Sequence, residues 1–317
     1  MNIIKFSSLF PNEESCIAHF KAQRDAHGVV CPKCGCEHHY WLQNKLRYEC
    51  KQCHYRQSLR AGTVMEFSKL PFMYWYIAMH LLTSTKKSFS AAELQRQLGH
   101  KRYQPIWEMV CKLRDVMGKR DNLYQLTGEV ELDNAFITTL IPEDQKGKPL
   151  KRGIGSQKQS KVVVMTESTF VENPKPGKKP KRVNHLKMVV IDDLKADTIS
   201  NTVKDHVDPS ADLTTDDATP YTKLAEHVKS HLAQVIKPED LPKILPWVHI
   251  AIGNVKRLLL DMHHQLTKEY LQYYLNEFCY KFNRRYFGEA IFDRLLIAAV
   301  SYNTDFKSRI YNRSSCG

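Results

Sequence analysis

Two Cys-x-x-Cys pairs constrain the fold of this chain more than any other feature of its sequence. Cys31 and Cys34 lie in the stretch CPKCGC, and Cys50 and Cys53 lie in CKQCH, with fifteen residues between Cys34 and Cys50. Four thiols at such spacings are typical of a redox site, a disulfide framework or a metal site. Other features of the sequence decide among the three.

A disulfide framework is disfavoured by the N-terminal sequence. The stretch MNIIKFSSLFPNEESC lacks the order of basic, apolar and small residues that a secretory signal has. We therefore expect the protein in the cytoplasm, a reducing compartment in which thiols rarely pair. A redox site of the thioredoxin type needs one Cys-x-x-Cys near a βαβ pattern, whereas this chain has two pairs close together.

A zinc ribbon accounts best for both pairs. The spacing matches tetrahedral sites in which Cys31, Cys34, Cys50 and Cys53 would bind a structural Zn²⁺. The stretch between them, HHYWLQNKLRYEC, is short and aromatic, which is typical of strands. Zinc supplies the folding free energy that so small a segment cannot obtain from burial. Four nearby side chains are less favoured as ligands: Cys36, His38, His39 and His54.

The charge balance indicates a polyanionic partner. The chain has 47 Lys and Arg against 34 Asp and Glu, a formal net charge of +13, and a pI of about 9.2. Nucleic acid is the leading candidate, and a basic solvated surface is the alternative. The most apolar window, LPFMYWYIAMHLL, is shorter than the roughly 20 residues that a membrane-spanning helix needs. We therefore expect no membrane segment.

Helical signals dominate up to about residue 126. Residues 12–24 have helical periodicity with Asn12 as the cap, and Ser68 and Pro71 suit the start of another helix. Ser90 can cap a further helix, Gly99 ends it, and a second begins near Gln104. These two helices match either a helix-turn-helix or a helical connector. In the first case Lys101 and Arg102 would meet DNA phosphates.

From residue 127 the pattern changes to that of a mixed α/β sheet. Three runs are strand-like: GEVELDNAFI, KVVVMTES and HLKMVVIDDL. ADTISNTVKDHV then predicts a helix, ADLTTDD a short strand and YTKLAEHVKSHL a helix. The run WVHIAIGNVKRLLLDMHHQL begins strand-like and becomes helical, and TKEYLQYYLNEFCYKFNRR predicts the last long helix.

Two loops rich in Lys, Gly and Pro interrupt the predicted sheet, EDQKGKPLKRGIGSQKQS and ENPKPGKKPKRVNH. A basic hairpin loop can clamp DNA phosphates, and a loop that is merely solvated is the alternative. The second loop carries the basic residues that we expect to bind DNA: Lys175, Lys178, Lys179, Lys181 and Arg182.

Three aspartates occupy positions that suit a metal site. Asp133 lies inside an apolar strand, where a charge is costly unless it faces a site or a partner. Asp216 and Asp217 end another predicted strand. Carboxylates from two strands can hold Mg²⁺, which also binds waters and substrate phosphates, and the basic composition favours a phosphodiester substrate. Aspartates that merely face solvent are the alternative.

Taken together, these motifs resemble one bacterial insertion-sequence transposase family. The similarity rests on the zinc ribbon, then VELDNAFI, LTTDDATPY and HIAIGNVKRLLLDMHHQL, and finally YLNEFCYKFNRR. It implies a multidomain α/β protein. The expected parts are an N-terminal helix and zinc ribbon over 1–60, a helical segment over 61–126, a ribonuclease-H-like mixed α/β catalytic domain over 127–302, and a tail over 303–317.

The resemblance also implies roles for individual residues. Asp133 and Asp216 match the first two catalytic acids of the DDE class, and the third acid is replaced by Asn254 in the pattern that includes Lys256. Catalytic Mg²⁺, with Mn²⁺ as a substitute, would bind to Asp133, Asp216 and Asn254. His249 and His264 match positions beside this pattern and are expected to contact DNA.

The chain departs from the family pattern at three positions. Asn134 follows the first aspartate where glutamate is common, and Asp217 and Asp261 occupy positions where glycine is common. Asn254 and Asp261 are two helical turns apart and share a face. Our hypothesis is that Asp261 or Asp217 supplies the negative charge that asparagine lacks.

The implied activity is cleavage of DNA at the ends of a mobile element and transfer of the freed 3′ hydroxyl into target DNA. The implied partners are terminal inverted repeats, target DNA and further copies of the chain, since such enzymes commonly assemble on paired ends. The expected location is the bacterial cytoplasm, at the nucleoid when DNA is bound. Two alternatives remain: a DNA-binding protein without catalysis, and a metal-dependent nuclease without strand transfer.

Overall fold

The computed structural model describes residues 1–174, 176–177, 180–216, 219–234, 244–263 and 265–306. The chain divides into two compact units, one formed by Met1–Arg120 with Arg284–Gly317, and the other by Asp121–Asn283. Five residues singled out from the sequence lie outside the described residues: Lys175, Lys178, Lys179, Asp217 and His264.

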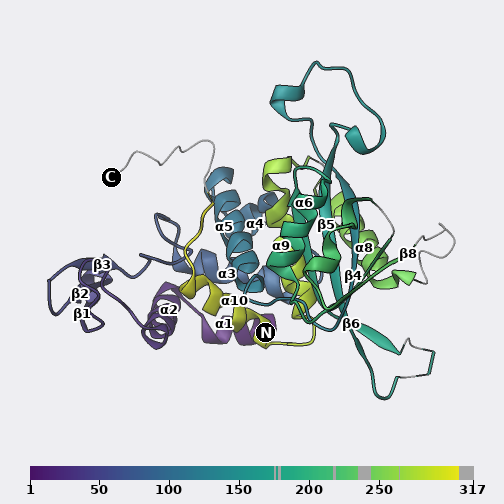
Figure 1. Ribbon diagram of the computed structural model, residues 1–317. Coiled ribbons are helices and arrows are strands. Elements are labelled where there is room, and N and C mark those ends of the chain that lie inside the picture. Colours follow the sequence, from purple (N-terminus) through teal and green to yellow (C-terminus); the bar gives the residue numbers. More distant parts are fainter. Residues whose placement is uncertain (175, 178–179, 217–218, 235–243, 264, 307–317) are drawn as a thin grey trace. The chain divides into compact units, whose positions relative to one another are not determined.

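The first unit contains helices and a small sheet. Its helices are α1 (Ile3–Leu9), α2 (Glu13–His27), α3 (Phe72–Ser84), α4 (Ala91–Leu98), α5 (Tyr103–Asp121, whose last residue belongs to the second unit) and α10 (Ala290–Ser301) (Figure 1). The sheet is an antiparallel meander of β1 (His39–Leu42), β2 (Arg47–Cys50) and β3 (Arg56–Ser58). The strands expected between the Cys pairs are therefore present.

Side-chain caps fix several helix starts in this unit. Asn12 and Ser15 form a capping box at α2, and the Ser90 side chain accepts from the N–H of Glu93 at α4. Gly99 ends α4 in the left-handed conformation, as expected. At α3, by contrast, the carboxylate of Glu13 accepts from the N–H groups of the first two helical residues, 2.7 and 2.8 Å away. Tertiary structure thus supplies a cap that the local sequence lacks.

The segment that follows residue 283 belongs to the first unit rather than to the catalytic domain expected over 127–302. Helix α10 packs against α2 and α3. Its Phe292 is fully buried, and its ring contacts the rings of Phe6, Phe10 and Tyr76. An aromatic core shared by the N-terminal segment, α3 and α10 explains the difference, because periodicity alone does not reveal which core a helix joins.

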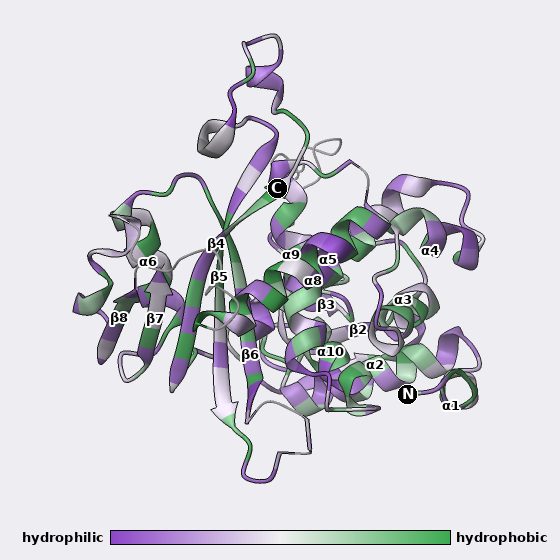
Figure 2. Cartoon of the chain, turned by 90° about the vertical axis from the view of Figure 1, so that its right-hand side faces the viewer, coloured by the Kyte–Doolittle hydropathy of each residue, from purple (hydrophilic) through white to green (hydrophobic). Residues whose placement is uncertain are grey.

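The second unit is built on a five-stranded mixed sheet in the order β6-β5-β4-β7-β8 (Figure 2). Strands β4, β5 and β6 are antiparallel neighbours, whereas β4, β7 and β8 run parallel. This is the ribonuclease-H-like arrangement that the resemblance implied. The strands are β4 (Glu129–Thr138), β5 (Gln159–Phe170), β6 (Lys181–Ile191), β7 (Asp212–Asp216) and β8 (Ser230–Gln234).

Helices cover the sheet on both faces. Alternate residues of β4 separate the two cores: Ala135 and Ile137 belong to the core under α8 and α9, whereas Val130 and Leu132 belong to the core under α6. Asp133 lies two residues before Ala135 on the same strand, so its side chain points to the same face, toward α8. The helices are α6 (Ala196–His206), α8 (Pro246–Met262) and α9 (Lys268–Asn283).

Two predictions for this unit are wrong. The run YTKLAEHVKSHL, expected to be a helix, forms two short 3₁₀ turns and the strand β8, because Leu224 and Val228 pack into the core under α6. The run from Trp247, expected to begin as a strand, is helical from its first residue to Met262. Pro246 occupies the first turn of α8, where its fixed φ favours the helix.

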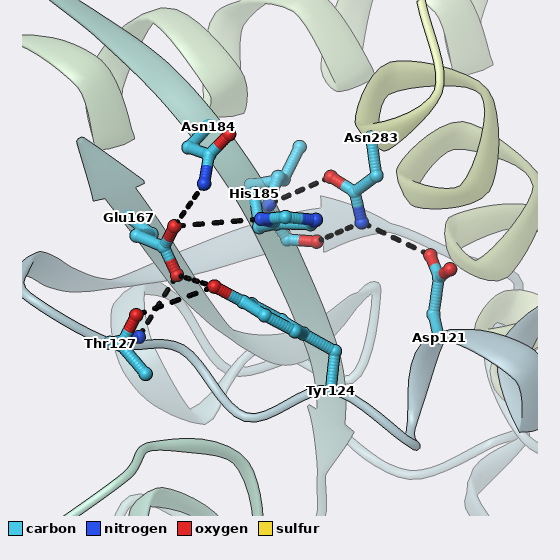
Figure 3. Close-up of polar contacts among 8 residues, drawn as sticks. Asp121, Tyr124, Thr127, Glu167, Asn184, His185 and Asn283 are labelled. Carbon is cyan, nitrogen blue, oxygen red and sulfur yellow. Dashed lines mark hydrogen bonds and ion pairs between the residues drawn. The ribbon is translucent and has the colours of Figure 1, made fainter. Parts of the chain in front are cut away.

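The outer edge of β6 is closed by side chains of α9. The Gln272 amide accepts from the N–H of Val190 and donates to the carbonyl of Met188, at 2.8 and 2.9 Å. The Asn283 amide bonds both the N–H and the carbonyl of Leu186, at 2.8 and 3.0 Å (Figure 3). These amides replace a neighbouring strand and so block edge-to-edge pairing with another chain.

A buried carboxylate holds the start of the second unit against the sheet. Glu167 on β5 is 2% exposed and accepts from the hydroxyl of Tyr124, the N–H of Thr127 and the amide of Asn184, with the His185 ring beside it (Figure 3). Burial raises the pKa of Glu167, but the hydrogen bonds outweigh it and hold that pKa below its ordinary value. The hydrogen-bond donors around Glu167 therefore stabilise its ionised carboxylate.

Among the described residues, every helix falls short of the length and apolar character that crossing a lipid bilayer requires.

Candidate active site and zinc site

The four paired cysteines converge in the ribbon. One sulfur from each of Cys31, Cys34, Cys50 and Cys53 lies within 4.8 Å of all the others. Backbone N–H groups, that of Cys53 foremost, hold the pKa of Cys50 below its ordinary value, which favours the thiolate that binds metal. The donor set fits a tetrahedral Zn²⁺ site.

The alternative ligands stay outside this cluster. Among the described residues, the four paired cysteines are the only group of three or more His, Cys, Asp or Glu donors at this mutual distance. The sulfur of Cys36 instead contacts the backbone of His38, and His39 bonds the carbonyl of Glu37. The spacing argument therefore selected the right thiols.

The parallel pairing of β4 and β7 brings the first two predicted acids side by side. Glu131 is paired with Thr214, and Asp133 and Asp216 each lie two residues further along their strand. They therefore occupy neighbouring positions on the same face of the sheet. Burial raises the pKa of Asp133, and the nearby Asp216 carboxylate raises it further, while the N–H of Asn134 lowers it. Such repulsion between carboxylates favours a bound cation.

Helix α8 places basic side chains near Asp133. The Nε2 atom of His249 lies 3.7 Å from Oδ2 of Asp133, and the charges of His249 and Lys256 both lower the pKa of Asp133. The two residues are seven apart, so they share one flank of the helix. Asp133, Asp216, His249 and Lys256 thus form one site, which we call the β4–α8 site.

Asn254 lies on a different flank of α8. At 3.6 residues per turn, it is rotated by about 140° from His249 around the helix axis. Its Oδ1 atom accepts a hydrogen bond of 2.8 Å from Nη2 of Arg257. Asp261, which is exposed, shares the flank of Asn254 rather than that of His249.

The remaining predicted DNA contacts differ in exposure and pairing. Lys101 and Arg102 are exposed in the turn between α4 and α5. Lys181 and Arg182 lie in β6 rather than in the loop where we expected them, because the β5–β6 hairpin continues to the bond between Val171 N–H and the Pro180 carbonyl. Lys181 is ion-paired with Glu129, so its charge is already engaged within the fold.

Sequence reasoning missed Glu131, which joins β4 to α8. Its Oε2 atom accepts hydrogen bonds from the N–H groups of Trp247 and Val248, at 2.8 and 2.9 Å. These N–H groups begin α8, so a carboxylate 116 residues earlier in the chain caps the helix and complements its dipole. The available signal was an acid two residues before Asp133, on the same face of an apolar strand.

Replacing Glu131 by Ala is expected to destabilise the protein by about 2–4 kcal/mol, because two partly buried N–H groups lose their acceptor. Denaturant unfolding would measure the change in free energy. Glu131→Gln is the matched control, since its amide oxygen still accepts both bonds, and it should cost no more than about 1 kcal/mol. Equal stabilities of the Ala variant and the parent would contradict this role.

Residue Asn134, where the resembling family commonly has glutamate, is also explained by the structure. Its side chain points to the opposite face of β4 from Asp133 and donates a 2.6 Å hydrogen bond to the hydroxyl of Tyr221. Tyr221 is buried, and burial together with the charges of Asp133 and Asp216 raises its pKa. The hydroxyl of Tyr221 therefore stays protonated.

Comparisons with known proteins agree with this architecture. A family model described as the ISXO2-like transposase domain matches residues 125–283, and one described as the transposase zinc-ribbon domain matches residues 11–56. Comparison with curated proteins and with solved structures found no match. Because the first family model spans half of the 317 residues and the second coincides with the four-thiol ribbon, this chain belongs to the ISXO2-like transposase family.

Proposed function

We propose that this protein cleaves DNA at the ends of its own mobile element and joins the freed 3′ hydroxyl to target DNA. The observation that carries the proposal is the register of β4 and β7, which makes Asp133 and Asp216 neighbours on one face of the sheet. Two carboxylates and a basic flank suit a divalent cation that is shared with a phosphodiester.

In this proposal Asp133 and Asp216 hold Mg²⁺ or Mn²⁺, and Asn254 remains a ligand suggested by resemblance alone. When bound, the metal supplies Lewis-acid activation of the attacking oxygen and charge stabilisation at the leaving oxygen. Lys256 orients the phosphate by its charge. Water attacks in the cleavage step and the 3′ hydroxyl in the joining step, so no covalent intermediate with the protein is needed.

The DNA partners follow from the same proposal. The zinc ribbon and the exposed Lys101 and Arg102 would bind the terminal repeats of the element, with copies of the chain assembled on paired ends. The protein would act on DNA in the bacterial cytoplasm. Inverted repeats that flank the gene, bordered by short direct duplications, would identify the DNA substrate.

A two-step DNA assay tests the proposal. The parent protein is incubated with a duplex that carries the element end, and separately with a pre-cut end and a plasmid, with Mg²⁺, with Mn²⁺ or with a chelator. We expect metal-dependent cleavage in the first reaction and covalent joining in the second. Nicks without joining would indicate a nuclease, and binding without either reaction would indicate a DNA-binding protein without catalysis.

A further inference from the structure

The imidazole of His249 lies beside the carboxylate of Asp133 in the β4–α8 site. Its Nε2 atom is buried, has no hydrogen-bond partner among the described residues, and lies 3.7 Å from Oδ2 of Asp133. A buried polar nitrogen without a partner is costly, so its orientation calls for an explanation.

The distance between these two atoms suits a shared ion better than a direct hydrogen bond. Hydrogen bonds between nitrogen and oxygen span roughly 2.7–3.2 Å, and 3.7 Å exceeds that range. Two donors that each lie about 2.0–2.2 Å from one ion are separated by about 2.8–3.6 Å, because ligand angles are about 90–110°. The observed 3.7 Å exceeds the upper limit of that range by about 0.1 Å, so a small shift of either side chain brings both atoms within reach of one cation.

The position of His249 is fixed by contacts on both sides of the helix start. Glu131 binds the N–H groups of Trp247 and Val248, directly before His249. The His249 N–H donates to the carbonyl of Leu245, and the side chains of Leu245 and Val248 are fully buried in the core under α8. The imidazole is thus presented to β4 by a packed and capped helix turn rather than by a loop.

We propose that His249 Nε2 is a direct protein ligand of the divalent ion at the β4–α8 site, together with Asp133. This inference rests on the proposed function, which supplies the ion. It assigns to His249 the position expected for Asn254, whose oxygen is bonded to Arg257 on another flank of α8. Since imidazole suits softer divalent ions than Mg²⁺, the site should bind Mn²⁺ more tightly than Mg²⁺.

Pulsed electron paramagnetic resonance of bound Mn²⁺ tests the proposal directly. Full-length protein is prepared with natural-abundance histidine and with ¹⁵N-histidine, and one equivalent of Mn²⁺ is added. We expect a hyperfine coupling between Mn²⁺ and a histidine nitrogen. It should be a ¹⁴N coupling in the unlabelled protein and a ¹⁵N coupling in the labelled protein, and it should be absent in His249→Gln. Calorimetry should show Mn²⁺ affinity at least about tenfold lower in that variant.

Two controls make the result decisive. Asp133→Asn should abolish the Mn²⁺ signal at the site, which identifies the ion as the one proposed, and thermal unfolding of His249→Gln should match that of the parent. Bound Mn²⁺ with no histidine coupling, in a parent protein that still cleaves DNA, would overturn the inference and leave the proposed function intact. Failure of the parent to bind Mn²⁺ or Mg²⁺ would overturn both.

Discussion

Asp133→Asn is expected to reduce metal-dependent DNA cleavage by at least about a thousandfold while DNA binding is unchanged. The substitution removes a charged ligand from the ion that activates the attacking oxygen, a contribution of several kcal/mol, and each 1.36 kcal/mol corresponds to about tenfold in rate. Single-turnover cleavage of an element-end duplex gives the rate, and a gel-shift titration gives the affinity.

The same variant should be at least as stable as the parent when a chelator is present. Burial raises the pKa of Asp133, so ionising this carboxyl in the folded state costs free energy at pH values above its ordinary pKa. Asparagine removes that cost. Denaturant unfolding at pH 7 without metal measures the difference, and lower stability of the variant would contradict the assignment of Asp133 as a carboxylate held in place for a cation.

A matched control separates the site from the general charge of the domain. Asp197 on α6 belongs to the same unit, its side chain is 76% exposed, and it is ion-paired with Lys223. Asp197→Asn makes the same chemical change away from the β4–α8 site and should leave cleavage within about twofold of the parent, since exposed ion pairs contribute little. Equal losses in the two variants would refute the assignment of the site.

Removing zinc is expected to unfold the ribbon while the second unit stays folded. The three strands of the ribbon hold only three or four residues each, and structural Zn²⁺ supplies about 10–16 kcal/mol in comparable small domains. After treatment with a strong chelator, amide exchange should become fast throughout β1–β3. Protection in β4–β6 should persist, because the core there is hydrophobic and contains none of the four paired cysteines.

Single cysteine substitutions test which sulfurs bind the zinc. Cys50→Ser should lose the bound zinc and the protection of the ribbon, whereas Cys36→Ser should retain one equivalent of zinc. Cys36 is the informative control, since it lies two residues from Cys34 but outside the four-sulfur cluster. Elemental analysis of the purified variants gives the zinc content. Loss of zinc in both variants would show that the ligand set differs from the one described.

Local signals in the sequence were sufficient for the features that depend on neighbouring residues. The spacing of Cys31, Cys34, Cys50 and Cys53 identified the metal ligands because two short turns bring each pair together. Asn12 and Ser90 marked helix starts since a cap acts within three residues. The three strands that contain Asp133, Val163 and Met188 were found from their apolar runs.

Features that depend on distant residues were decided by the tertiary structure. The run YTKLAEHVKSHL has a helical pattern of apolar residues. Its last residues nevertheless form β8, because they hydrogen-bond to the parallel strand β7. Asn254 and Lys256 are close in sequence, yet a helix turns them to different flanks. In the sequence Glu131 has no evident partner. Only the fold shows that its carboxylate accepts hydrogen bonds from the first N–H groups of α8.

By itself, then, the sequence determined the zinc ribbon, the fold class and the strands that carry Asp133 and Asp216. Only the tertiary structure decided that His249 faces Asp133 and that α10 joins the N-terminal unit. The physical reason is the separation along the chain over which each interaction acts. Turn, cap and periodicity preferences depend on a few neighbouring residues, so the local sequence predicts them. Which segment packs against a given flank of a helix depends on contacts between segments more than a hundred residues apart.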